Sequence, residues 1–274
     1  MRRIARTATR RAAVLAAVVT AVAPAVTALA ATPASAAPLS VTKVEGAAGN
    51  AAGLAPTVNA FRALLGGPDN GSAPGSQPGG RREINWDGVS DTSASPALLP
   101  PDFFNTTVPR GAVFANPNGD KFQVSADSSN PGNTPVEFAN LGAGNAARFT
   151  SFSPERLFSP IGTTTTRIRF FEPGTNQPAT VKGFGAVFTD VDRGGSSRVE
   201  LYDQWNNRLW GKDVLTGTTA HGSLSFLGVR TNAAIYEVRI RSGNQALRAG
   251  AAETSWLDLV ALDDFLYSEP RPLP

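Results

Sequence analysis

Pairs of carboxylates recur where apolar runs of this sequence begin or end. The pairs are Glu83 with Asp87, Asp190 with Asp192, and Asp263 with Asp264. Calcium is bound in proteins by oxygen atoms, mainly those of Asp and Glu side chains. We therefore predict that carboxylates in these positions converge on Ca²⁺. The alternative is that they cap turns or pair with Arg81, Arg82 or Arg193.

Aromatic residues gather around a second feature, the Asn206-Asn207 turn. Trp205 lies in or beside this turn, and Tyr202 and Trp210 lie in the apolar runs on either side of it. An exposed aromatic side chain at a loop tip can stack on a sugar ring. We predict ligand binding by Trp205, Tyr202 and Trp210. In the alternative interpretation Trp210 packs in the core and Trp205 only covers the turn; Trp86 and Trp256 are predicted core residues.

The inventory of side chains limits catalysis. His221 is the only histidine and the chain has no cysteine, which excludes thiol nucleophiles and zinc sites built on several histidines. No G-x-S-x-G motif is present, so a Ser-His-Asp triad is not predicted. A carboxylate pair for glycoside cleavage stays open, because the separation that matters is spatial and 22 acidic residues are available.

The first 36 residues have the pattern of a secretory signal peptide. Five arginines and no acid precede an Ala/Val/Leu-rich run over 12–31, and Ala34-Ser35-Ala36 supplies a cleavage signal. We expect cleavage after Ala36, secretion, and no membrane span in the mature chain. The remainder has 25 − 5 = 20 basic and 22 acidic residues, a net charge of −2, which argues against a nucleic-acid partner.

Short apolar runs separated by turn residues fill the chain beyond Arg82, which is typical of an antiparallel β-sandwich. Strands are predicted over 113–115, 122–125, 147–152, 166–171, 180–191, 198–203, 208–215, 224–229, 236–241 and 258–267. Asn118-Gly119 predicts a hairpin turn. Apolar and polar residues alternate in several runs, so one face of each strand should point into the core and the other should face solvent. The fold class is therefore mostly β, a jelly-roll-like sandwich over residues 83–270 with a tail at 271–274.

The segment before the sandwich, residues 37–82, is predicted to hold one short helix and a flexible linker. Val58, Phe61 and Leu65 share a helical face over 57–65, and Gly66 follows as a helix stop. Residues 66–80 are rich in Gly, Pro and Ser, a composition typical of connectors. Within the sandwich, two glycines in one strand (VKGFGAVF) indicate either a bulge or the close approach of another group.

Several motifs resemble those of a family of exported bacterial proteins whose function is uncharacterised. They are RREINWDGV at 81–89, FRALLGG at 61–67, GFGAVFTDVD at 183–192, SLSFLGV at 223–229 and LDDF at 262–265. The resemblance spans roughly residues 57–269 and implies a secreted sandwich similar to galactose-binding-like carbohydrate modules, without implying an activity. Such modules often hold a structural ion between their first and last strands. By that similarity Glu83, Asp87, Asp263 and Asp264 are the preferred calcium ligands, and Asp190 and Asp192 form a second candidate pair.

The sequence favours a secreted, non-catalytic binding protein. We expect a calcium-stabilised module for extracellular carbohydrate or the cell envelope, on the basis of the paired acids and the aromatic residues. One alternative is a structural or matrix-interaction protein without a small-molecule site. Another is a carboxylate-dependent glycosidase or lyase, which would need two acids in one cleft.

Overall fold

Antiparallel strands dominate the computed structural model, which describes residues 38–218 and 221–273. The described residues form 13 strands, and the composition is 36% strand and 12% helix. The predicted mostly-β, sandwich-like fold class is confirmed. The predicted signal peptide, residues 1–36, lies outside the described residues. None of the described helices is long and apolar enough to cross a lipid bilayer.

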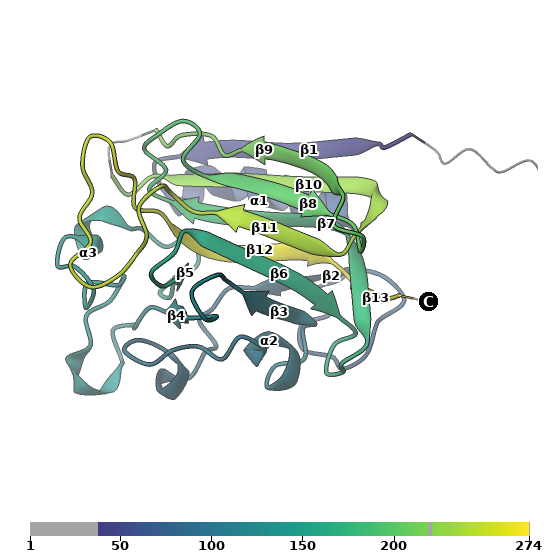
Figure 1. Ribbon diagram of the computed structural model, residues 1–274, viewed down its shortest axis with the longest axis horizontal. Coiled ribbons are helices and arrows are strands. Elements are labelled where there is room, and N and C mark those ends of the chain that lie inside the picture. The colour runs from purple at the N-terminus through teal and green to yellow at the C-terminus, as the bar shows by residue number, and fades with distance from the viewer. Residues whose placement is uncertain (1–37, 219–220, 274) are drawn as a thin grey trace, which may run out of the picture. The chain divides into compact units, whose positions relative to one another are not determined.

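The strands form two layers, which we call sheet A and sheet B (Figure 1). Sheet A contains four long strands in the order β1 (Val41–Ala48), β10 (Leu224–Ile235), β7 (Pro178–Thr189) and β12 (Ala261–Ser268). Two short strands, β2 (Arg81–Ile84) and β5 (Phe158–Pro160), pair with β12. A third, β4 (Phe122–Val124), pairs with β5. Sheet B contains β3 (Ala112–Ala115), β6 (Thr165–Phe171), β11 (Glu237–Arg241), β8 (Arg198–Tyr202) and β9 (Arg208–Asp213). The first residues of β7 also pair with β6 and with β13 (Arg271–Pro272), so β7 joins the two sheets.

The main core fills the space between the sheets. Along β7, Phe184, Ala186 and Phe188 belong to this core together with inward residues of sheet B such as Ile168 and Val199. Burying alternate apolar residues of both sheets supplies most of the driving force for this architecture.

Trp86 lies in the same core, as predicted. Its ring stacks on Phe158 with centroids 4.2 Å apart, and its indole nitrogen donates a hydrogen bond to the Asp263 carbonyl. Trp256, the other predicted core tryptophan, is 74% exposed, so that prediction was wrong. It lies in the long loop between β11 and β12, where the Arg193 guanidinium lies 5.5 Å from its ring centroid.

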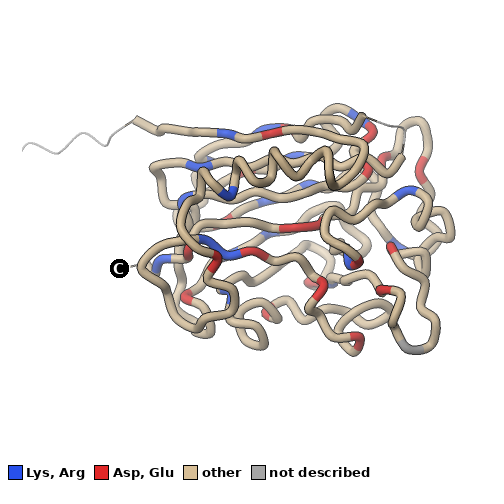
Figure 2. Tube along the Cα trace, turned by 180° about the vertical axis from the view of Figure 1, so that it is seen from behind, with Lys and Arg blue, Asp and Glu red and all other residues tan. Residues whose placement is uncertain are grey.

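Helix α1 (Ala51–Leu65) covers the other side of sheet A (Figure 2). It begins at Asn50, whose side chain accepts a hydrogen bond from the backbone of Gly53, and ends at Gly66 with φ 75°. Its buried residues pack against Val187, Leu224, Phe226 and Leu266 of the sheet. The predicted helix therefore exists, and starts six residues earlier than expected. The remaining helices are short: α2 (Phe103–Thr106), α3 (Asn145–Arg148) and the 3₁₀ turns Asp91–Ser93 and Pro131–Asn133.

The two glycines of β7 accommodate that helix. A Cβ at Gly183 would lie 2.6 Å from Leu65, and one at Gly185 would lie 2.7 Å from the Phe61 ring. The sequence left a bulge and a close approach open as explanations of these glycines. The structure shows the close approach at both, and next to Gly183 the pairing of β7 with β10 also shifts register.

Three local predictions differ from the structure. The Asn118-Gly119 turn does not close a hairpin, because β3 pairs with β6 in sheet B whereas β4 pairs with β5 in sheet A. Residues 147–152 form no strand, and α3 ends within them at Arg148. Residues 41–48, for which no strand was predicted, form the edge strand β1. Its Gly46 lets α1 approach closely, because a Cβ there would lie 2.7 Å from Thr57.

The expected flexible connector is held against the sandwich by a buried ion pair. Arg82 Nη2 donates to Glu269 Oε1 at 2.8 Å, and both side chains are almost fully buried. Asn70 Nδ2 and the Gln77 backbone N–H donate to the same carboxylate, and the Gly75 carbonyl accepts from Arg82. The connector thus wraps this pair, which satisfies polar groups of a segment whose apolar side chains are only Ala73 and three prolines.

Candidate functional site

The predicted carboxylates of the last strand lie on one side of it because of a β-bulge. The pairing of β12 with β7 shifts register between Leu262 and Phe265, both of which face the core. A bulge re-aims side chains in this way. Ser153 Oγ donates to Asp264 Oδ1 at 2.6 Å and lies 3.3 Å from Asp263 Oδ1, so both carboxylates reach the same residue.

Asp263 and Asp264 hold a proton between them more readily than isolated carboxylates would. Burial, followed by the charge of Asp264, raises the pKa of Asp263 well above its usual value. Burial also raises the pKa of Asp264 to about 6, against the hydrogen bond from Ser153. With Phe152 N also donating to Asp263 Oδ2 at 2.5 Å, the pair clamps the 152–153 segment onto β12.

Glu83 lies on β2, which pairs with β12, so the predicted proximity of these strands is present. Its oxygens, however, accept hydrogen bonds from two arginines: Arg62 Nη2 at 2.7 Å and Arg81 Nε at 2.6 Å. Burial acts to raise the pKa of Glu83, but these guanidinium groups hold it below its usual value. The Arg62 group also lies 3.6 Å from Asp264. Arginines therefore occupy the place that a calcium ion would take beside Glu83.

Asp87, the fourth preferred ligand, is engaged by a backbone group rather than by an arginine side chain. Its Oδ1 accepts a hydrogen bond from the backbone N–H of Arg156 at 3.0 Å. Burial is the main cause that raises its pKa, and this hydrogen bond opposes the rise. Asp87 thus anchors the segment that leads into β5.

The second predicted pair belongs to a different cluster. Asp190, Asp192, His221 and Glu253 each offer one ligand atom, and these atoms all lie within 4.8 Å of one another. They come from the end of β7, the turn before β10 and the loop between β11 and β12. His221 Nδ1 is 3.7 Å from both Asp190 Oδ1 and Asp192 Oδ2. We call these four residues the acidic cluster.

Backbone geometry aims Asp190 into the acidic cluster. Its φ of 69° lies in the left-handed region, which Asp adopts more readily than most residues. Its Oδ1 accepts a hydrogen bond from Gly222 N at 3.1 Å, which connects the end of β7 to the turn that carries His221. Asp192 is connected to the third segment, because its backbone N–H donates to Asp258 Oδ1 at 3.2 Å.

The oxygens of the acidic cluster are buried and short of hydrogen-bond donors. Asp190 is fully buried, and Asp190 Oδ2 and Asp192 Oδ1 accept no hydrogen bond from the described residues. Arg148 of α3 supplies one positive charge, with its Nε 2.5 Å from Glu253 Oε2 and 3.4 Å from Asp190 Oδ2. Three ionised carboxylates and one guanidinium leave a surplus of two negative charges, which a divalent cation would neutralise.

The same surplus shifts the proton affinity of these groups. Burial, then the charges of Asp192 and Glu253, raises the pKa of Asp190 to about 8. Burial also raises the pKa of Glu253 to about 7, against the charge of Arg148, and raises the pKa of Asp192. Perturbed carboxyl groups can serve in acid–base catalysis. A glycosidic bond cannot approach the fully buried Asp190, so the arrangement suits a small cation better than a sugar.

Sequence reasoning had identified only half of this cluster. His221 was considered only as a catalytic base, although a sole histidine downstream of an Asp-x-Asp pair was an available signal. Glu253 lies in a loop without a motif, so no signal pointed to it. The geometry allows two kinds of ion: calcium would use the carboxylate oxygens, whereas a transition metal would also take the His221 nitrogen.

The outer side of sheet B is hollowed. One hollow of about 370 Å³ is lined by residues that include Tyr202, Tyr236, Asn206, Arg169 and Arg239. A second, of about 340 Å³, shares Arg239 and extends to Arg198 and Arg241. Volumes in this range are typical of small-ligand sites.

The three predicted aromatic ligands separate in the structure. Trp205 is 74% exposed and lines a small apolar hollow that shares Asp203 and Gln204 with the larger one. Tyr202 is half-buried in the larger hollow, and the Arg239 guanidinium lies 3.8 Å from its ring centroid. Trp210 packs against the core between the sheets. Tyr202 and Trp205 therefore lie near each other, whereas Trp210 takes the core position given above as its alternative.

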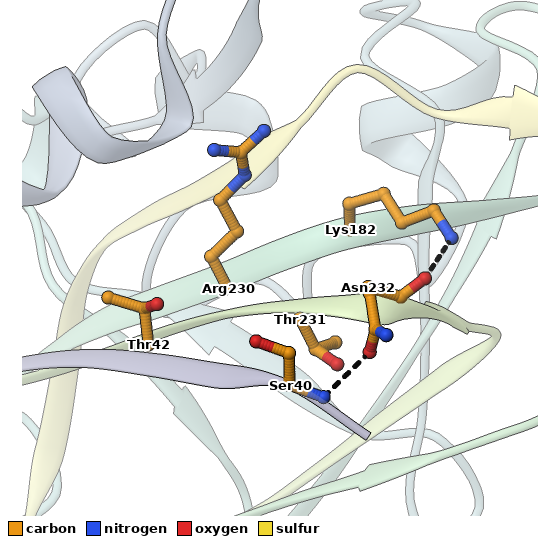
Figure 3. Close-up of a pocket in the computed structure, with 6 residues that line it drawn as sticks. All are labelled: Ser40, Thr42, Lys182, Arg230, Thr231 and Asn232. Atoms are coloured by element: carbon orange, nitrogen blue, oxygen red, sulfur yellow. Dashed lines mark hydrogen bonds between the residues drawn. The ribbon is translucent and has the colours of Figure 1, made fainter. Parts of the chain in front are cut away.

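A further hollow of about 340 Å³ lies at the start of β1 (Figure 3). Its polar groups bond to one another: Asn232 Oδ1 accepts from Ser40 N, and the Asn232 carbonyl accepts from Lys182 Nζ. Figure 3 shows Arg230 pointing away from these contacts. These hydrogen bonds link the start of β1 and strand β7 to β10. The residues that line this hollow include no carboxylate, histidine or aromatic side chain.

No family model matches the chain, and no curated protein matches its sequence. The resemblance described above therefore stays a prediction, and the function has to be argued from the sites themselves.

Proposed function

We propose that this chain is a secreted, non-catalytic binding protein that holds extracellular carbohydrate on the outer side of sheet B. The observation that carries this proposal is the hollow of about 370 Å³, in which tyrosine rings, side-chain amides and guanidinium groups lie together. Sugars present ring faces and hydroxyl groups, which such side chains bind by stacking and hydrogen bonding.

A bound divalent cation forms the second part of the proposal. The acidic cluster supports it, because buried carboxylate oxygens without donors need either protons or a cation. The ion would connect the end of β7, the turn before β10 and the β11–β12 loop, and so stabilise the loops at one end of the sandwich. Calcium is the proposed ion, bound through Asp190, Asp192 and Glu253.

A glycan array probed with the purified protein, once with calcium and once with a chelator, tests the binding function. We expect binding to a defined group of glycans, and its loss when Trp205 is replaced by Ala in a protein that still folds. An array without any binding in either condition would refute the proposal. Release of shortened glycans from the array would favour the glycosidase or lyase alternative.

A further inference from the structure

We propose that the outer side of sheet B binds a glycan that carries carboxylate groups, such as a chain of uronic acids. This inference rests on the proposed carbohydrate-binding function and names the class of sugar. It concerns the outward side chains of β6, β8 and β11, which we call the arginine face: Arg167, Arg169, Arg198, Glu200, Glu237, Arg239 and Arg241.

The arginine face has a charge opposite to that of the chain as a whole. Its five arginines and two glutamates give 5 − 2 = +3, whereas the chain after residue 36 has a net charge of −2. The intervening residues of the three strands, such as Ile168, Leu201 and Val238, belong to the core. The charges therefore lie on one side of three neighbouring strands.

The strand register places like charges directly opposite each other. Arg239 of β11 pairs with Arg167 of β6, and Arg241 of β11 pairs with Arg198 of β8. Like charges in directly opposed positions destabilise a sheet. The same register also places Glu237 opposite Arg169 and Arg239 opposite Glu200. In each like-charged pair one arginine has an acidic partner, whereas the other, Arg167 or Arg241, has none among the described residues. An anion beside Arg167 and Arg241 would relieve the remaining repulsion.

Among the described residues, acidic side chains pair with three of the five arginines and leave two unmatched. Arg198 pairs with Glu200 and with Asp213 of β9. Glu237 accepts hydrogen bonds from both Arg169 and Arg239, at 2.9 and 2.5 Å. Arg167 is exposed, and no acidic side chain among the described residues pairs with it. Arg241 donates only to the Ser196 and Gly195 carbonyls, which leaves its charge unmatched.

Two of the guanidinium groups, those of Arg239 and Arg169, are also held in place. Arg239 lies over the Tyr202 ring, 3.8 Å from its centroid, and donates to Asn206 Oδ1 as well as to Glu237. Arg169 lies 6.0 Å from the centroid of the Tyr236 ring. Arginines fixed in this way lose little conformational entropy on binding, and their planar groups match carboxylates.

The two sheets differ in what covers their outer sides. Helix α1 covers sheet A, whereas among the described residues no helix lies over β6, β8 and β11, which run side by side across the front of Figure 1. The arginine face is therefore accessible to a ligand.

The mixture of groups favours an acidic glycan over other polyanions. Half-buried Glu200 can accept hydrogen bonds from the hydroxyls of a sugar ring, which phosphate groups do not offer. A nucleic acid also needs a longer run of positive charge to contact several phosphates. A uronic acid offers a carboxylate to arginine and hydroxyls to glutamate within one ring.

The test compares a hexamer of galacturonic acid with its methyl ester, which keeps the sugar chain and removes the charge. Titrations are done in low salt with a chelator, so that calcium cannot cross-link the acid. We expect the acid to bind at least about tenfold more tightly than the ester, because hydrogen bonds to charged groups are the stronger ones. Arg167→Gln and Arg241→Gln should each weaken binding of the acid about tenfold.

Arg230→Gln is the matched control, because it removes an exposed arginine from β10 of sheet A. Equal binding of acid and ester, or unchanged binding by both folded variants of the arginine face, would overturn the inference. So would a short single-stranded DNA or phosphatidylserine vesicles that bind as tightly as the acid. Binding of a neutral glycan alone would overturn the inference and keep the proposed function, whereas no binding to any glycan would end both.

Discussion

The ring of Phe61 lies directly on Gly185, where a Cβ would come within 2.7 Å of the Phe61 Cε1 atom. Gly228 is the partner of Gly185 on β10, and a Cβ there would lie 2.6 Å from the same ring. Gly185 and Gly228, a pair of glycines in adjacent strands, thus form the surface on which Phe61 of helix α1 packs.

Gly185→Ala should therefore destabilise the protein. The added methyl group must displace a buried aromatic ring, which costs about 1–3 kcal/mol of unfolding free energy. Urea denaturation followed by circular dichroism measures the change. Gly194→Ala is the control, because a Cβ at Gly194 meets no atom within 4 Å. Equal midpoints for the two variants would show that the helix does not pack on these glycines.

Stability should fall as the pH rises from 5 to 8 in the presence of a chelator. The folded-state pKa of Asp190 is raised to about 8 from 3.8, so the stability that its protonated form contributes is lost as the pH rises through this window. The slope is at most about 1.4 kcal/mol per pH unit for each proton released. In Asp190→Asn the melting temperature should therefore fall less steeply with rising pH than in the parent. Identical slopes for the variant and the parent would contradict the assignment.

Calcium should raise the melting temperature at pH 8. A site with a Kd of ~10⁻⁴ M gains about 1.4 kcal/mol at roughly 1 mM ion, which corresponds to a few degrees. Glu253→Gln should abolish this shift, whereas Glu83→Gln should lower the starting temperature and keep the shift. The reverse result would place the ion between β2 and β12. A larger shift with Mn²⁺ that is lost in His221→Ala would indicate a transition-metal site.

Arg167→Gln should make the protein slightly more stable while it weakens glycan binding. The substitution removes one of two opposed arginines, an unfavourable cross-strand pair worth roughly 0.2–1 kcal/mol. Chemical denaturation in low salt measures the gain, which should shrink at 1 M salt because the repulsion is screened. A loss of stability would mean that Arg167 makes a favourable contact and does not merely face Arg239.

Trp205→Ala should leave the unfolding free energy within about 0.5 kcal/mol of the parent, since the side chain is exposed. Binding to the glycans identified on the array should weaken, because the ring stacks on sugar in our proposal. Trp256→Ala is a matched control of equal exposure, 74%, at a different place in the fold. Equal effects of the two substitutions on affinity would remove Trp205 from the binding site.

The alternation of apolar and polar residues was enough to predict the two-layered β fold. Ile168, Val199, Val238 and their neighbours face the core because side chains along a strand point to opposite sides. The spacing of Val58, Phe61 and Leu65 also predicted the helix, although over 57–65 and without its first six residues. These features depend on local periodicity, which a sequence contains directly.

Pairing between distant strands was decided by the tertiary structure alone. The Asn118-Gly119 turn has a good local hairpin signal, yet β3 and β4 enter different sheets because each finds a partner far along the chain. In the same way Glu83 meets Arg62, while Asp190 and Asp192 meet His221 and Glu253. The pairing of Glu83 with Arg81, two residues away on the same strand, was already among the alternatives that the sequence offered. The sequence determined which residues carry charge and which side of each strand they face. Folding decided which of the charges meet, because contacts such as that between Asp190 and Glu253 join segments more than 60 residues apart.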